Sequence, residues 1–320
     1  MKKIIRGLLL TVFLSLAAIP VAHCEEKPAP AVADLYWLGG EDVSYDYDHG
    51  ALIPLRENRP GLTPLPIISL LPKAIPAPYG RPLIAIVIDD MGVDQKHSAR
   101  AVRNLNPQVT LSYLAYAPHV REQVSAAKKQ GHEIFLHLPW EPDSAHADPG
   151  PRHLSVDMPK EQLQQNLLAN LNGFDGYIGV NNHMGSKFSR YRAGLETVMT
   201  ELKKRGVFFL DSRTTPDSLA EKVALEYDIP ATYRDVFLDH VEKPEFVAAA
   251  LREVESVARR KGSAVAIGHP KDMTLDALEA WLPTLEAKGF QLAPITDVIK
   301  YRQSAATAHV AHLEAGKIKK

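Results

Sequence analysis

The sequence predicts an α/β domain built on a parallel β-sheet, either open or closed into a barrel. The main observation is that short apolar runs alternate with longer amphipathic stretches from residue 82 to about residue 301. Strict alternation of strand and helix is typical of parallel sheets. The second observation is size, because about seven β/α units in roughly 220 residues favour one barrel-like domain over two small ones.

The strands are expected at continuous apolar runs, since the strands of a parallel sheet are covered on both faces. These runs are 83–88, 109–114, 133–138, 177–180, 207–210, 264–267 and 290–292. Helices commonly end at a glycine. The clearest helices are expected at 159–171, 193–205, 244–261 and 275–288, and the last three are each followed by a glycine.

Composition and charge limit the kinds of partner. The chain has 320 residues, of which 45% are hydrophobic and 23% are charged, as in ordinary folded proteins. The formal net charge of -1 creates no long-range field that would attract nucleic acid or an anionic membrane. We therefore expect no nucleic-acid partner.

The N-terminus has the three regions of a secretory signal peptide. Three basic residues lie within the first six, and the apolar run 7–19 ends at Pro20, which is the pattern of a cleaved leader. A membrane anchor would need about 20 continuous apolar residues. We therefore expect residues 1–24 to be a signal peptide, cleaved after Ala22 or Cys24, and no stable transmembrane anchor to remain. The predicted localisation is periplasmic or secreted.

The segments that flank the predicted domain, 82–302, differ from it in composition. Cys24 is the only cysteine, so no internal disulfide is expected in the mature domain. Residues 25–81 are rich in proline, which interrupts helices, and they are predicted to form a linker or a strap on the domain. Residues 303–320 are alanine-rich with a basic end and are predicted to be a flexible tail.

Polar side chains follow several predicted strands, at the point where each strand ends. In parallel α/β folds the carboxyl ends of the strands gather at one edge, where active sites form. Residues of this kind are Asp89, Asp90, His137, His183, Asp211 and His269. The sequence therefore predicts one site built from these side chains.

Some of these side chains form a candidate metal site. The adjacent carboxylates Asp89 and Asp90 repel each other unless a cation or a shared proton relieves them, so one could bind a metal while the other acts as a base. Taken alone, the pair is more simply explained as an acidic turn that caps the following helix. With His137 and His183 at other strand ends, however, Asp90 forms a ligand set suited to zinc or another divalent transition metal.

Five motifs, taken in order along the chain, resemble those of the polysaccharide deacetylases, and within them the divergent polysaccharide deacetylase branch of bacterial envelopes. The resemblance extends from about residue 82 to residue 301. It implies an irregular (β/α)7 barrel of the glycoside hydrolase/deacetylase type. The motifs lie at 88–92, 131–137, 180–185, 211–213 and 264–270.

The resemblance implies roles for the residues of the first two motifs. It makes Asp89 the general base, and it makes Asp90 and His137 metal ligands. Where the usual enzymes of the family have a second metal-binding histidine, this chain has Glu141. We expect His183 to take the place of that histidine, with Glu141 as the alternative ligand.

The remaining motifs imply roles around the substrate. The backbone amide of Met184 would contribute to the oxyanion hole, and His269 would be the general acid. Asp211, with Arg213 beside it, would orient the catalytic histidine. Trp140 follows a predicted strand and is a candidate platform for stacking on a sugar, although a core position would explain it nearly as well.

The expected function is that of an exported, metal-dependent, deacetylase-like hydrolase that removes acetyl groups from an N-acetylated glycan, either peptidoglycan or an exported polysaccharide. The expected cofactor is a divalent metal, with zinc (Zn2+) first. The changes at Glu141 and in the loop 181–183 leave an alternative, a catalytically silent sugar-binding envelope protein on the same scaffold. A metal-dependent phosphoesterase is a third hypothesis, but in the motif loops only Lys187 and Arg213 could bind a phosphate.

Overall fold

The computed structural model describes residues 43–46, 51–54 and 80–317, with side chains described for residues 80–306. The predicted signal peptide and most of the proline-rich segment lie outside these ranges. Within the described part, β1 (Val43–Asp46) pairs with β2 (Ala51–Pro54) in an antiparallel ladder. No helix in these ranges is both long and apolar enough to cross a membrane.

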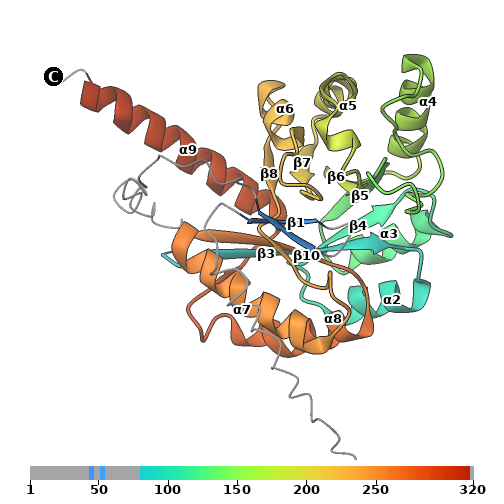
Figure 1. The fold of residues 1–320 in the computed structure, drawn as a ribbon. Helices are drawn as coiled ribbons and strands as arrows, with labels where there is room; N and C mark the ends of the chain where they lie inside the picture. The colour runs from blue at the N-terminus through green and yellow to red at the C-terminus, as the bar shows by residue number, and fades with distance from the viewer. Residues whose placement is uncertain (1–42, 47–50, 55–79, 318–320) are drawn as a thin grey trace, which may run out of the picture. The chain divides into compact units, whose positions relative to one another are not determined.

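The main domain is built on one curled sheet of parallel strands (Figure 1). Its order is β8-β7-β6-β5-β4-β3-β10-β9, with β11 paired to β3 beside this path, and every neighbouring pair is parallel. The strands are β3 (Leu83–Met91), β4 (Thr110–Leu114), β5 (Ile134–Trp140), β6 (Gly179–Met184), β7 (Phe208–Asp211), β8 (Ala231–Tyr233), β9 (Val236–Phe237), β10 (Ser263–Gly268) and β11 (Gln291–Leu292). Because β8 and β9 end the path, the barrel is open, and the predicted irregular (β/α)7 barrel is confirmed.

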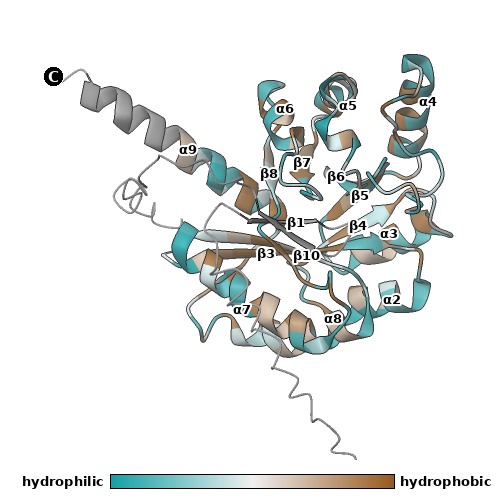
Figure 2. Ribbon diagram, in the orientation of Figure 1, coloured by the Kyte–Doolittle hydropathy of each residue, from teal (hydrophilic) through white to brown (hydrophobic). Residues whose placement is uncertain are grey.

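Helices cover the outer face of this sheet. Figure 1 shows α4, α5 and α6 beside one part of it and α7 and α8 beside another. In Figure 2 the strands are largely hydrophobic, while the outward sides of the helices are hydrophilic. The helices are α2 (Gln95–Asn104), α3 (Val120–Lys129), α4 (Lys160–Leu171), α5 (Arg192–Arg205), α6 (Ala220–Glu226), α7 (Pro244–Lys261), α8 (Asp272–Trp281) and α9 (Ile295–Lys317), with the 3-10 turns η2 (Phe188–Arg190) and η3 (Leu282–Thr284).

Two segments near the C-terminus differ in secondary structure from what the sequence suggested. The helix predicted at 275–288 begins earlier, at Asp272, and ends at Trp281, because Pro283 in the following turn has no amide hydrogen to continue it. The segment predicted as a flexible tail, 303–320, is helical as far as Lys317. Its alanine-rich composition favours a helix that extends from an already packed first turn.

The two faces of the sheet bury different sets of side chains. On β3, Ile86 and Ile88 belong to a hydrophobic cluster that includes the outer helices. Ala85 and Val87, which point to the opposite face, belong to a second cluster that includes Ile295 in the first turn of α9. The start of α9 therefore covers the apolar part of the inward face, and the alternation along each strand determines which residues can reach the interior.

Candidate active site

The inward face of the sheet changes from apolar to polar at the carboxyl ends of its strands. On β3 the inward series passes from Val87 to Asp89, and on β5 it passes from Phe135 to His137. A pocket of about 360 Å³ opens at this edge, and its walls include Asp89, Asp90, His137, His183, Met184 and His269. A larger hollow of about 520 Å³ between α4 and α5 contains none of these side chains, so size alone does not identify the site.

A bulge at the end of β3 turns two consecutive carboxylates into this pocket. Neighbouring residues of a regular strand point to opposite faces of the sheet. Between Ile88 and Met91 the pairing with β4 shifts register, and Asp90 adopts a left-handed conformation with a φ of 55°. A bulge of this kind redirects a side chain, so Asp89 and Asp90 both line the pocket.

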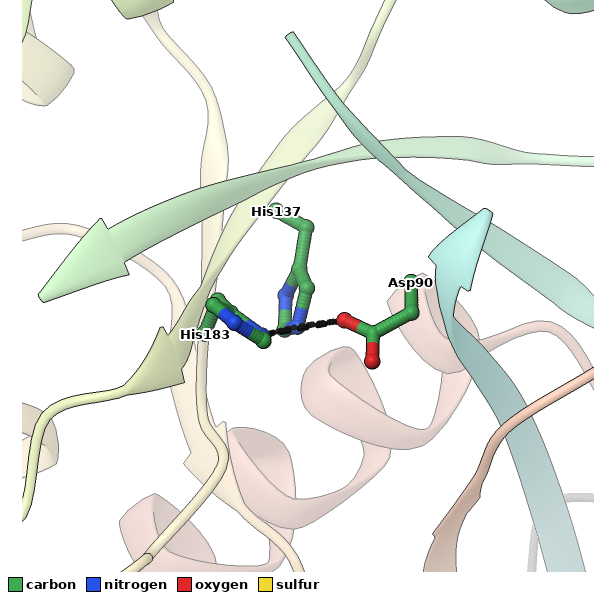
Figure 3. A group of neighbouring side chains, drawn as sticks. All are labelled: Asp90, His137 and His183. Atoms are coloured by element: carbon green, nitrogen blue, oxygen red, sulfur yellow. Dashed lines mark hydrogen bonds and ion pairs between the residues drawn. The ribbon is translucent and has the colours of Figure 1, made fainter. Parts of the chain in front are cut away.

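Asp90, His137 and His183 converge from three strand ends and form a group that could hold a metal ion, here called the metal-ligand group (Figure 3). The distance from Asp90 Oδ1 to His183 Nδ1 is 2.9 Å and to His137 Nε2 is 3.4 Å. The two ring nitrogens lie 3.2 Å apart. One ligand atom from each residue therefore lies within 4.8 Å of the others, and two imidazoles with one carboxylate form a donor set that suits zinc and similar divalent metals.

The chemistry of Asp90 fits a bound cation. Its Oδ1 atom is buried and makes no well-formed hydrogen bond to any group in the described part of the chain. Burial opposes its ionisation, but the neighbouring rings of His137 and His183 outweigh burial and hold the pKa of Asp90 well below its usual value. Asp90 is therefore ionised at neutral pH with one oxygen aimed at the two imidazole nitrogens, as a metal ligand would be.

Glu141, the alternative ligand, is occupied elsewhere. Its Oε1 atom lies 2.7 Å from Lys187 Nζ, and its Oε2 atom accepts a hydrogen bond of 2.8 Å from the backbone amide of Val156. Glu141 does not belong to the metal-ligand group. Of the two candidates for the third ligand, the geometry thus favours His183.

Asp89 lies beside the metal-ligand group but is held differently. Its side chain is almost fully buried, and both of its oxygens accept hydrogen bonds from Asn181 Nδ2, at 2.8 and 3.0 Å. Burial raises the pKa of Asp89 above its usual value, although His137, His269 and the amide of Asn181 oppose this effect. A carboxylate with a raised pKa is a stronger base than an exposed one, which fits the role implied for Asp89.

His269 lines the opposite wall of the pocket and is oriented by a carboxylate that the sequence did not identify as catalytic. Its Nδ1 atom lies 2.9 Å from Asp239 Oδ1, and its backbone amide donates to Asp239 Oδ2 at 2.7 Å. Its Nε2 atom is 3.6 Å from Asp90 Oδ2. Burial alone would lower the pKa of His269, but Asp239, Asp90 and Asp89 raise it to about 9, which favours the protonated ring.

The role expected for Asp211 is corrected by this geometry. Asp211 accepts hydrogen bonds from the backbone amides of Arg213 and Glu221 and from the hydroxyl of Ser218. It therefore organises the loop after β7, while Asp239 orients the histidine. Asp239 follows the two-residue strand β9, which lies next to β10 in the sheet. In the sequence Asp239 is visible only as a carboxylate at the end of a strand. The sequence does not show that this strand pairs with β10, which is followed by His269.

Arg213 also contributes to the fold of this loop. Its guanidinium stacks on the ring of Tyr233, 4.7 Å from the ring centroid. The arginine that lines the pocket is Arg234, which donates to the backbone carbonyls of Ser212 and Arg213 at 2.6 and 2.7 Å. A cation thus forms part of the pocket wall.

Trp140 is a core residue. It is 0% exposed and packs against Phe188 and Phe209, with ring centroids 5.2 and 6.1 Å apart. This position corrects the expectation of a sugar-stacking platform, because a side chain with no exposed face cannot stack on a substrate.

Met184 lies in the pocket wall at the end of β6, and its backbone is strained and well held. It has a φ of 51°, and its carbonyl accepts hydrogen bonds from Asn182 Nδ2 at 2.7 Å and from Thr214 Oγ1 at 3.2 Å. Non-glycine residues in this conformation need support from their surroundings. The role of its amide in an oxyanion hole stays a prediction.

Comparison with known proteins gives consistent results. The sequence profile of divergent polysaccharide deacetylases matches residues 86–299. An uncharacterized protein of Haemophilus influenzae is 34% identical over 208 residues, which are 65% of this chain and 73% of that protein. The uncharacterized protein YibQ of Escherichia coli K12 is 31% identical over 229 residues, which are 71% of this chain and 69% of that protein.

A solved structure supports the same fold. The crystal structure of an uncharacterized protein from Agrobacterium tumefaciens C58 superimposes with a TM-score of 0.66 at 29% sequence identity, over 68% of this chain and 89% of that protein. The profile match covers more than half of the chain and contains the whole metal-ligand group. The chain belongs to the divergent polysaccharide deacetylase family.

Proposed function

We propose that this protein is a metal-dependent hydrolase that removes acetyl groups from an N-acetylated glycan. One observation carries the proposal: the metal-ligand group, the buried carboxylate of Asp89 and the carboxylate-bound imidazole of His269 line the same pocket. Hydrolysis of an acetamide needs an activated water, a base that takes its proton and an acid that protonates the amine as it leaves. The family assignment is consistent with this reaction.

The residues of the chain divide the work of this reaction. A divalent metal held by Asp90, His137 and His183 would supply Lewis-acid activation of the water and of the acetyl oxygen. Asp89 would accept a proton from the water as the water oxygen bonds to the acetyl carbon. His269 would donate a proton from Nε2 to the nitrogen as the carbon–nitrogen bond breaks, and the products are acetate and a free amine. The amide of Met184 would donate to the oxyanion.

We also propose that the metal is zinc and that the protein is exported to the cell envelope. Two imidazoles and one carboxylate are a common ligand set of catalytic zinc sites. The basic residues and apolar run at the N-terminus support a signal peptide, and an envelope location would bring the protein to peptidoglycan or to an exported polysaccharide. Sequencing the N-terminus of the protein recovered from the periplasm or the medium tests this part, and an intact N-terminus on cytoplasmic protein would contradict it.

The test of the reaction combines metal content with turnover. Purified protein is expected to bind about one zinc per chain and to release acetate from an N-acetylated chitooligosaccharide or from peptidoglycan. The variants His183→Ala and Asp89→Asn separate the roles, because the first removes a ligand and the second keeps the ligand group but removes the base. Glu141→Gln is the matched control, since the carboxylate of Glu141 binds Lys187 and lies outside the metal-ligand group.

The outcomes separate the proposal from its rivals. Metal binding that is lost in His183→Ala and kept in Asp89→Asn, together with loss of turnover in both variants, supports the hydrolase. Metal and glycan binding without turnover would favour the catalytically silent sugar-binding protein. Turnover of a chromogenic phosphate ester, with none of acetylated sugars, would favour a phosphoesterase, for which Arg234 in the pocket wall could bind the phosphate.

A further inference from the structure

Asn181 lies at the centre of the candidate site, although neither its residue type nor its position in the sequence marks it as catalytic. It belongs to β6 and points to the same face of the sheet as His183, two residues further on. Its side chain is 0% exposed. It lies between Asp89 on β3 and His137 on β5, and it contacts both of them.

The amide of Asn181 uses its full hydrogen-bonding capacity. A side-chain amide has two N–H donors and two acceptor lone pairs. The Nδ2 atom donates to both oxygens of Asp89, at 2.8 and 3.0 Å, and to Ser212 Oγ at 3.1 Å. The Oδ1 atom accepts from Ser112 Oγ at 2.5 Å and from His137 Nδ1 at 3.0 Å. A fully satisfied buried network of this kind is rigid and leaves one arrangement of its members.

The orientation of the amide determines the tautomer of His137. The NH2 group of Asn181 donates to Asp89, and its carbonyl oxygen accepts from the hydroxyl of Ser112 and faces His137. A carbonyl oxygen only accepts, and therefore Nδ1 of His137 carries the hydrogen in this contact. In the neutral ring the lone pair is then on Nε2, and this atom lies 3.4 Å from Asp90 Oδ1 and 3.2 Å from His183 Nδ1.

We propose that Asn181 is a positioning residue that couples the two halves of the reaction, since one amide holds the base Asp89 and fixes the metal-binding tautomer of His137. The inference rests on the proposed function and extends it to a residue outside the ligands and the acid–base pair. Partners that orient a ligating histidine in this way contribute about 10–100-fold to metal affinity. A neutral amide performs both tasks without adding charge beside Asp89.

Two substitutions of similar volume separate the two contacts. Asn181→Asp keeps an acceptor for His137 Nδ1 but replaces the donor to Asp89 with a second carboxylate oxygen. Asn181→Leu removes both contacts. We expect Asn181→Asp to keep zinc affinity within about threefold and to lower kcat by about 100-fold or more, because the base is repelled or shares a proton with its neighbour. We expect Asn181→Leu to lose kcat to a similar extent and to lower zinc affinity by about 10–100-fold as well.

The control is the same substitution at another buried asparagine. Asn170 on α4 is 0% exposed and donates to the backbone carbonyls of Arg152 and Asn166, away from the pocket. Asn170→Asp is expected to change the melting temperature but not kcat or zinc affinity. Should Asn181→Leu fail to fold, Asn181→Ala tests the same loss of both contacts.

The readouts keep a failure of this inference distinct from a failure of the proposed function. If the wild-type protein neither binds zinc nor releases acetate, the proposed function is wrong. In that case long-range proton–nitrogen NMR of His137 still tests the inference, because the Nδ1–H tautomer is expected in the wild type and in Asn181→Asp but not in Asn181→Leu. Equal zinc affinity and equal kcat in wild type and Asn181→Leu, or the opposite tautomer in the wild type, would overturn it.

Discussion

Replacing Asp239 with asparagine is expected to move the alkaline limb of the pH–rate profile to lower pH. The pKa of His269 is raised from 6.5 to about 9. At about 1.4 kcal/mol per pKa unit, this shift favours the imidazolium by roughly 3 kcal/mol. Burial opposes the shift, the hydrogen bond to Asp239 is its largest favourable cause, and the charges of Asp90, Asp239 and Asp89 follow in that order.

The sign of the effect follows from the role of His269 as an acid. The ring must carry a proton to protonate the leaving amine, so the wild-type rate is expected to hold up to about pH 9 and to fall above it. Asparagine removes the negative charge but not the burial, so the pKa of His269 is expected to fall by about one unit or more. A fall of one unit should therefore lower kcat/KM by about twofold at pH 8 and by about tenfold at pH 10, beyond any loss from misorientation of the ring.

The assay is release of free amine from an N-acetylated chitooligosaccharide, measured between pH 6 and pH 10. Asp211→Asn is the comparison variant, because the hydrogen bonds described for the Asp211 carboxylate come from the loop after β7 and the first turn of α6, and none comes from His269. It is expected to lower stability without moving the alkaline limb. An unmoved limb in Asp239→Asn, or a moved limb in Asp211→Asn, would refute the assignment of Asp239 as the residue that orients His269.

Three other predictions concern the metal, the core and stability. His183→Ala is expected to lower zinc affinity by about 100-fold or more, whereas Glu141→Gln should leave it within about threefold, as measured by competition with a chromogenic chelator. Trp140→Ala is expected to lower the free energy of unfolding by about 3–5 kcal/mol through loss of core packing, with KM unchanged. A raised KM at unchanged stability would instead indicate that Trp140 contacts the substrate. Burial and the charge of Asp211 raise the pKa of Glu221 to about 7, so the stability associated with its protonated form is present below about pH 4.5 and is lost as the pH rises through 7. Glu221→Gln should therefore be more stable than wild type at pH 8, by about 1–2 kcal/mol after allowance for its partial exposure, and equal to it at pH 4.5 in urea unfolding; equal stability at both pH values would contradict the burial argument.

The strands were predictable because their signal is local. A strand covered on both faces is apolar along most of its length, and each predicted run overlaps a strand of the sheet. The position of Trp140 was predictable as well. His137 and Trp140 are three residues apart on β5, so they point to opposite faces, and an inward His137 places Trp140 in the outer core.

The missed residues depend on contacts between distant segments. Asp239 and His269 are 30 residues apart, and their contact follows from the pairing of β9 with β10. A strand of two residues has no periodicity by which a sequence could reveal it. The sequence suggests a loop at Asn181, whereas the structure places this residue in β6. The apolar run of β6 gives way to polar residues at the edge where the sheet faces the pocket.

By itself the sequence determined the fold class, the alternation of strands and helices and the residue types at the strand ends, because these follow from apolar runs and from neighbours along the chain. Only the tertiary structure decided that a bulge turns Asp90 into the pocket beside Asp89, that His183 rather than Glu141 lies close to Asp90 and His137, and that Asp239 holds His269. The physical reason is that chemistry requires groups within about 3 Å of one another. Distances of that size are set by strand order and by local bulges, which arise from packing between segments far apart in the sequence.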